Sequence, residues 1–123
     1  MRSAAETLSA SITVAEALNF SRTSQYQCWP VCDKHGVVGV VNVQRLQRAA
    51  DEQTGTKQVA DILDARAFPH LHADQSIHMA LERMGEAGMD LLPVVSRADV
   101  HTLEGIVLQR DVLDSYRIGE DRN

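Results

Sequence analysis

The chain has 123 residues, 44% of them apolar and 24% charged, and its net charge at pH 7 is −5. This length predicts one compact domain, or two small domains that need each other. The acidic balance argues against a nucleic-acid partner, since phosphate binding needs a basic face. The sequence has neither an apolar run of the ~18–20 residues that span a membrane nor an apolar secretion signal.

The first expected element is a short helix that begins after Thr13. In the pattern Thr13-x-x-Glu16, the threonine hydroxyl can accept an N–H of the first turn while the glutamate carboxylate reaches back. This capping box predicts where the helix starts. Its inward face is expected to carry Val14, Ala17, Leu18 and Ser21.

A β-hairpin and a second helix are expected next. Tyr26–Cys32 and Val37–Asn42 are typical of strands, and Asp33–Gly36 of the turn between them, because its glycine can take a positive φ. The two cysteines, four positions apart in the first strand, would lie about 13 Å apart at ~3.3 Å per residue. They cannot form a disulfide with each other at that distance, and we expect a reduced, cytosolic chain. The second helix is predicted over Val43–Ala50, with Val43, Leu46 and Ala50 inward.

The stretch 51–57 is polar and contains glycine, so it is expected to link two halves. One helical turn at Val59–Leu63 and an extended segment at Phe68–His72 should follow. Another capped helix is predicted to start after Ser76 and to end at a glycine, either Gly85 or Gly88. Its apolar positions at i, i+3, i+4 and i+7 are Ile77, Ala80, Leu81 and Met84.

The last part of the chain predicts a strand at Leu91–Val95, a second strand that follows Leu103 and ends near Gln109, where the hydrophobic period changes, and a closing helix at about Val112–Ile118. Arg110 and Asp111 stand at the start of that helix, where exposed backbone N–H groups favour polar ligands. We therefore expect a functional site at this junction. One face of the helix should carry Val112, Leu113 and Tyr116.

The two halves repeat one pattern. Trp29–Cys32 corresponds to Leu92–Val95, and Gly39–Val41 corresponds to Gly105–Val107. In both halves the helix-capping residue and the strand proline are 17 positions apart. The period of 63 to 66 residues is too long for a solenoid, so each copy is expected to be half of a pseudo-symmetric module.

A repeat of capped helix, φ-Pro-Val-Val strand, polar turn, φ-Gly-φ-φ strand and helix resembles the cystathionine β-synthase (CBS) domain. Two in tandem resemble the Bateman module, over about Leu8 to Tyr116. The resemblance implies an α/β fold of two pseudo-symmetric repeats, packed sheet to sheet, with repeat 1 at 1–50, a linker at 51–58 and repeat 2 at 59–123. It also implies a homodimer, adenine-nucleotide clefts between the repeats and a regulatory role without catalysis.

A finer resemblance is to the cytoplasmic C-terminal module of ClC-type chloride channels and antiporters. There an aromatic residue before the strand proline packs on adenine, and a basic-Asp pair at the final helix holds ribose. A carboxylate can accept bonds from both ribose hydroxyls, a guanidinium can bind phosphate and a tyrosine ring can stack on a purine. The resemblance thus implies a cytosolic module attached to a membrane transporter and sensing ATP, ADP or AMP. The candidate nucleotide-binding residues are Tyr26, Gln27, Cys28, Trp29, Arg110 and Asp111.

Two departures from the family pattern bear on this site. Leu108 stands where many nucleotide-binding repeats carry Thr or Ser, and Arg45 replaces the carboxylate of Asp111 in the first repeat. At most one cleft can then hold ribose through a carboxylate. A nucleotide sensor and a structural dimerisation module with degenerate clefts both stay open. The parent could also be an enzyme or another transporter.

Metal binding and catalysis have less support from the sequence. His70 and His72 would share one face of an extended segment and could bind zinc with Asp74 or His78, but solvated histidines are commoner and no metal is expected. The sequence has no nucleophile–base spacing, phosphate loop or dinucleotide fingerprint, so no catalytic residue is expected. The core and dimer face are expected to take up Met79, Met84 and Met89.

Overall fold

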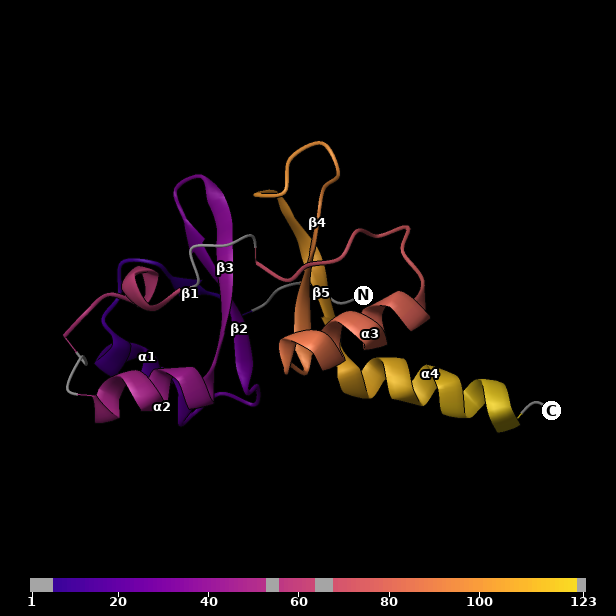
Figure 1. The fold of residues 1–123 in the computed structure, drawn as a ribbon, viewed down its shortest axis with the longest axis horizontal. Helices are drawn as coiled ribbons and strands as arrows, with labels where there is room; N and C mark the ends of the chain where they lie inside the picture. Colours follow the sequence, from indigo (N-terminus) through magenta and orange to yellow (C-terminus); the bar gives the residue numbers. More distant parts are fainter. Residues whose placement is uncertain (1–5, 53–55, 64–67, 122–123) are drawn as a thin grey trace. The chain divides into compact units, whose positions relative to one another are not determined.

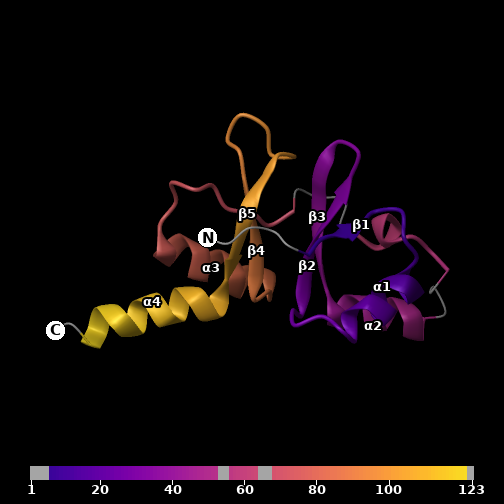
Figure 2. The same ribbon diagram turned by 180° about the vertical axis from the view of Figure 1, so that it is seen from behind.

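The structure is a computed structural model that describes residues 6–52, 56–63 and 68–121, with side chains to residue 115. The chain forms two compact units (Figures 1 and 2). The N-terminal unit runs to Phe68 and the C-terminal unit begins at Pro69. No helix in the described ranges is long and apolar enough to cross a membrane.

The N-terminal unit is a three-stranded sheet with two helices that pack on each other. β2 and β3 are antiparallel, β1 joins β2 in parallel, and Gly36 takes a φ of 118° at the hairpin turn. The sheet order is therefore β1-β2-β3. The elements are β1 (Leu8–Ser9), α1 (Val14–Ser21), β2 (Cys28–Asp33), β3 (Gly36–Asn42), α2 (Val43–Asp51) and the 3₁₀ turn η1 (Val59–Ile62).

The C-terminal unit is a two-stranded antiparallel sheet with two helices that pack on each other. An isolated parallel bridge joins Leu71 to Val94, in the place that β1 takes in the other unit. The elements are α3 (Ile77–Ala87), β4 (Leu91–Val95), β5 (Leu103–Leu108) and α4 (Gln109–Asp121).

The internal repeat extends to details of the backbone. The register of each hairpin shifts once, between Val31 and Cys32 in one and between Val94 and Val95 in the other. The first helix of each unit is capped in the same way, because the hydroxyl of Thr13 or Ser76 accepts an N–H three residues on. The predicted α/β fold of two matching repeats is confirmed.

Each unit has its own apolar core under its helices. In the N-terminal unit the largest fully buried side chain is Trp29, and in the C-terminal unit Met84 and Leu92 are fully buried. The first core comprises Leu8, Ala10, Val14, Ala17, Trp29, Val31, Val41, Leu46, Ala49 and Val59. The second comprises Leu71, Ala80, Met84, Leu92, Val94 and Val112.

At two positions the structure favours glycine over a residue with a side chain. A Cβ built on Gly39 would lie 3.0 Å from the methyl groups of Leu63, so the absence of a side chain at this position leaves room for Leu63. Gly88 takes a φ of 65° as the C-cap of α3 and donates its N–H to the Met84 carbonyl. Of the two glycines predicted to end this helix, Gly88 is the one that does so.

Several apolar positions differ from the predicted inward faces. Ile77 is 46% exposed and Leu113 is 51% exposed, while Ala49 is buried and its neighbour Ala50 only partly so. Leu113 is turned one helical position away from the buried Val112, about 100° around the axis. The closing helix also begins at Gln109, earlier than predicted, and the Tyr116 side chain lies outside the described residues.

The first hairpin strand begins at Cys28, two residues later than predicted. Neither cysteine of this strand is part of a disulfide, in agreement with the prediction from their spacing. Burial raises the pKa of the Cys32 thiol, with the neighbouring Asp33 carboxylate adding to the shift.

Candidate functional site

The junction of β5 and α4 holds the two charged residues that the sequence singled out. Leu108 ends β5 and is buried, and the Gln109 N–H that follows donates to the Asp90 carbonyl at 2.8 Å. Arg110 and Asp111 are then the second and third residues of α4, the first exposed and the second half-buried. Because the side chain of leucine carries no oxygen, Leu108 cannot cap this helix with its side chain.

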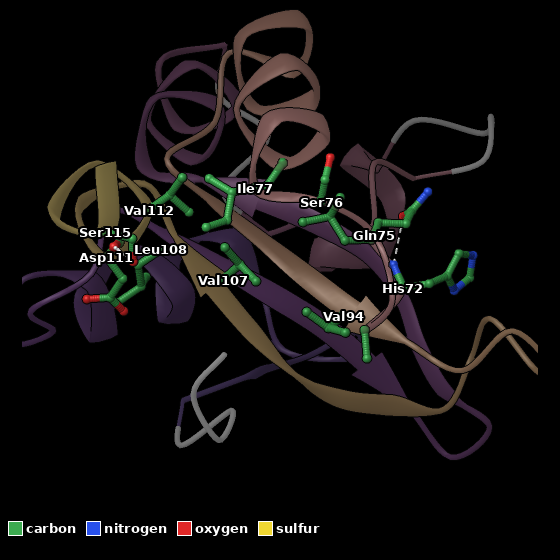
Figure 3. Close-up of a pocket in the computed structure, with 13 residues that line it drawn as sticks. His72, Gln75, Ser76, Ile77, Val94, Val107, Leu108, Asp111, Val112 and Ser115 are labelled. Atoms are coloured by element: carbon green, nitrogen blue, oxygen red, sulfur yellow. Dashed lines mark hydrogen bonds between the residues drawn. The ribbon is translucent and has the colours of Figure 1, made fainter. Parts of the chain in front are cut away.

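A cavity of about 240 Å³ lies beside this junction, between the helices of the C-terminal unit and its sheet. Figure 3 shows Asp111 and Ser115 at one end and His72 and Gln75 at the other, with apolar side chains between them. The full lining is Leu71, His72, Ala73, Gln75, Ser76, Ile77, Ala80, Val94, Val107, Leu108, Asp111, Val112 and Ser115.

The charge of this lining is acidic. Asp111 contributes a carboxylate, and among the described lining residues there is no Lys or Arg. His72 is held in place, since its Nδ1 lies 2.9 Å from the Val95 carbonyl oxygen and its main-chain N–H donates to the Gln75 side chain at 2.8 Å. A carbonyl oxygen can only accept, so Nδ1 carries a proton in this contact, and the Asp111 carboxylate is an acceptor at the other end of the cavity. The cavity therefore suits ligands that donate hydrogen bonds.

The corresponding junction in the N-terminal unit differs in both charge and capping. Asn42 caps α2 by accepting the Arg45 N–H at 2.8 Å, and the exposed Arg45 stands where α4 has Asp111. The carboxylate is thus replaced by a cation, as the sequence indicated.

The four candidate residues before the first hairpin lie in the N-terminal unit. Tyr26 is half-buried against the first core and Gln27 is exposed, with its carbonyl accepting the Val43 N–H at 2.9 Å. Cys28 and Trp29 are buried, and both are paired with β3 in the sheet. That these four share one site with Arg110 and Asp111 stays a prediction.

The sequence reasoning did not assign Ser115, His72 or Gln75 to the ligand site at Asp111. Ser115 lies four positions after Asp111 and so falls on the same helical face, a spacing that the sequence already contained. His72 was considered only for metal, and Gln75 not at all. These two reach the cavity through the pairing of Leu71 with Val94, which local periodicity does not reveal.

Three of the possible zinc ligands, His70, His72 and Asp74, make other contacts in the structure. The rings of His70 and His72 meet edge to face with centroids 5.1 Å apart. The hydrogen bond from Arg97, at 3.0 Å, holds the pKa of the Asp74 carboxyl below its usual value, so this carboxylate is already paired. Within the described residues there is no group of three or more potential metal ligands.

The architecture defines a tandem α/β domain pair, two repeats of capped helix, antiparallel hairpin and second helix. The family model of the CBS domain matches residues 1–52 and 59–117, so the chain belongs to the CBS-domain family. Members of this family are regulatory or signalling modules. Among curated proteins none matches the chain.

Several solved structures are similar. The CBS domains of a transcriptional regulator from Streptococcus pneumoniae are 27% identical, with a TM-score of 0.69 over 88% of this chain and 86% of that one. Hypoxic Response Protein I, solved with two zinc ions, shares the fold at 20% identity, with a TM-score of 0.75 over 93% and 92%. A CBS domain pair in complex with 5′-methylthioadenosine and S-adenosyl-L-methionine shares it at 21% identity, with a TM-score of 0.72 over 89% and 86%.

Proposed function

We propose that this chain is a regulatory CBS pair that binds an adenosine-derived ligand, with the carboxylate of Asp111 holding the ribose. The observation that carries the proposal is the position of Asp111, the third residue of α4 and part of the lining of the cavity. An ionised carboxylate can accept hydrogen bonds from both vicinal hydroxyls of a ribose. The apolar lining contributed by Val94 and Val107 would cover the rest of the nucleoside.

The lining favours ligands that carry little negative charge. The cavity offers one carboxylate and no described cation, and the exposed Arg110 is not among its lining residues. Its volume of about 240 Å³ is below the roughly 300–1,000 Å³ of pockets that enclose a whole drug-sized ligand. A nucleoside fits this setting better than a triphosphate. The similar CBS pair solved with two adenosine derivatives supports the same ligand class.

A thermal-shift series tests this preference. At equal concentration, adenosine, 5′-methylthioadenosine and S-adenosylmethionine are expected to raise the melting temperature more than AMP, ADP or ATP, because an acidic lining repels phosphate. Equal shifts by ATP and adenosine would refute the preference for low charge. No shift by any of the six compounds would refute the sensor function itself.

A structural dimerisation module is the second candidate function, and two observations favour it. Leu108 removes a hydroxyl that could bind the ligand, and Arg45 removes the carboxylate of the other repeat. A variant of Tyr26 distinguishes the two functions. Under the sensor function, the Tyr26 ring would stack on the adenine of a bound ligand. Under the structural function, Tyr26→Ala would change only the stability of the N-terminal unit.

We also propose that the chain forms homodimers through its helices. Leu113 on α4 is 51% exposed and Phe20 on α1 is 37% exposed, both large apolar side chains. Light scattering at tens of micromolar is expected to give the mass of two chains, and Leu113→Asp is expected to reduce it towards one. A wild-type mass of one chain at that concentration would contradict this.

The larger protein to which this module would be attached is also a proposal. Attachment to a membrane transporter of the chloride-channel type, with the module on the cytoplasmic side, agrees with the Arg110-Asp111 pair. Among the three similar structures described above, one belongs to a transcriptional regulator. Regulation of a cytoplasmic enzyme, or of another transporter, fits the same site chemistry.

A further inference from the structure

The segment Lys57–Ile62, which overlaps the end of the predicted linker and is called the linker segment below, packs on the N-terminal unit. Main-chain hydrogen bonds and apolar side chains hold it there. The Val14 N–H donates to the Lys57 carbonyl at 2.8 Å, and the Val59 N–H donates to the Ile12 carbonyl at 2.8 Å. Val59 is fully buried in the first core. The segment thus closes a groove formed by the extended residues before α1 and the first turn of that helix.

The C-terminal unit has the same groove before α3. The same hydrogen bond shapes the backbone in both units. The Gln75 N–H donates to the His72 carbonyl at 3.0 Å, and at the equivalent position the Ile12 N–H donates to the Ser9 carbonyl at 3.4 Å. The groove positions correspond at an offset of 63 residues. The pairs are Ile77 and Val14, Gln75 and Ile12, and Ala73 and Ala10.

No described segment covers the second groove. Ile77 is 46% exposed where Val14 has no exposed surface, and Ala73 is exposed where Ala10 is 8% exposed. Within the described residues, the Ile77 N–H and the carbonyls of Ala73 and Gln75 make no hydrogen bond. The groove therefore presents an apolar edge beside a donor and two acceptors, in the arrangement that holds the linker in the other unit.

We propose that this groove, bounded by Ala73, Gln75 and Ile77, binds a segment of a partner polypeptide with the chemistry of Lys57–Ile62. Such a segment is extended at first, continues into one helical turn and carries branched apolar side chains at its third and sixth positions. Main-chain bonds to an extended edge supply affinity, and the apolar contacts select the side chains. Ala73, Gln75 and Ile77 also line the cavity that contains Asp111, so a bound peptide and an adenosine ligand would compete. The two proposals are separated by Asp111→Ala, because the Asp111 side chain is not one of the three residues that bound the groove.

A peptide titration tests the groove directly. A synthetic peptide with the sequence of Thr56–Leu63 is added to the ¹⁵N-labelled full chain, and amide shifts are followed by NMR. Saturable shifts are expected at Ala73, Gln75 and Ile77, with the same response in the Asp111→Ala variant. A control peptide with Val59→Asp is expected to bind at least about tenfold more weakly, because it loses a buried apolar contact.

Two variants of the full chain make the test specific. Ile77→Asp is expected to weaken peptide binding about tenfold or more, and it is tolerated by the fold because an acidic residue suits the first turn of a helix. Val100→Asp is the matched control: Val100 is 39% exposed, lies outside the groove and should leave the binding unchanged. Unchanged binding by Ile77→Asp, or no saturable shift at millimolar peptide, would overturn the proposal.

Other occupants give distinct results. If the peptide shifts none of these amides while Ile77→Asp lowers the mass from two chains to one, the groove is a contact between copies of this chain. If adenosine shifts all three amides and the peptide shifts none, the groove belongs to the nucleoside. Either result overturns the peptide assignment.

Discussion

Replacing Asp111 with alanine is expected to remove most of the stabilisation that an adenosine ligand gives this chain. Ligand at a hundred times its dissociation constant stabilises the wild type by ~2.7 kcal/mol. Loss of a charged acceptor costs ~1.5–3 kcal/mol, or roughly tenfold to a hundredfold in affinity. The same ligand concentration should then stabilise Asp111→Ala by only about 0.4–1.4 kcal/mol. Differential scanning calorimetry with and without ligand measures both values.

Arg45→Ala is the matched control, since Arg45 is the third residue of α2 as Asp111 is of α4. It should leave the ligand-induced stabilisation nearly unchanged. Asp111→Asn separates charge from shape, because the amide keeps one acceptor oxygen and should give an intermediate loss. Full binding by Asp111→Ala, or calorimetry that shows two equivalent sites in each chain, would refute the assignment of the ligand to Asp111.

Trp29→Ala is expected to give the largest loss of stability of any single change in the N-terminal unit. The Trp29 side chain is 1% exposed, its Nε1–H donates to the Ser24 hydroxyl oxygen at 3.1 Å, and its ring meets Phe20 edge-on at 6.1 Å. Truncating such a residue costs ~3–5 kcal/mol, against ~5–15 kcal/mol for the whole folding free energy of a typical domain. Urea denaturation followed by circular dichroism measures the loss.

Two controls define the cause of that loss. Trp29→Phe keeps most of the apolar burial and loses only the hydrogen bond to Ser24, so its loss should be smaller. Val100→Ala removes apolar atoms that are 39% exposed and should change the unfolding free energy by no more than about 0.5 kcal/mol. A loss below about 1 kcal/mol in Trp29→Ala would contradict the assignment of this residue to the centre of the core.

Much of the local structure was predictable because it depends on neighbours in the chain. The caps of Thr13 and Ser76 marked two helix starts, since a hydroxyl three residues before an N–H is enough to form the bond. Gly36 and Gly88 marked a turn and a helix end, because few other residues adopt a positive φ. Strand β4 has its predicted bounds and β5 falls within the predicted second run, since a run of branched apolar residues between polar turns has few alternatives.

The candidate site was predictable only in part. Asp111 was found because the change of period after the last strand locates a helix start, where polar ligands are favoured. His72 and Gln75 were missed because a bridge between Leu71 and Val94, 23 positions apart in sequence, brings them to the same cavity. Local periodicity carries no information on such pairing.

By itself the sequence determined the order of elements, the twofold repeat and the CBS family, because caps, turns and hydrophobic period act over a few residues. Only the tertiary structure decided which apolar residues are covered. Val14 and Ile77 occupy equivalent positions of the repeat, yet one is buried and the other is 46% exposed. The difference is the linker segment around Val59, which packs on the N-terminal unit and has no described counterpart on the C-terminal one. Burial is a property of what packs against a residue, and that is set by contacts between segments distant in the chain.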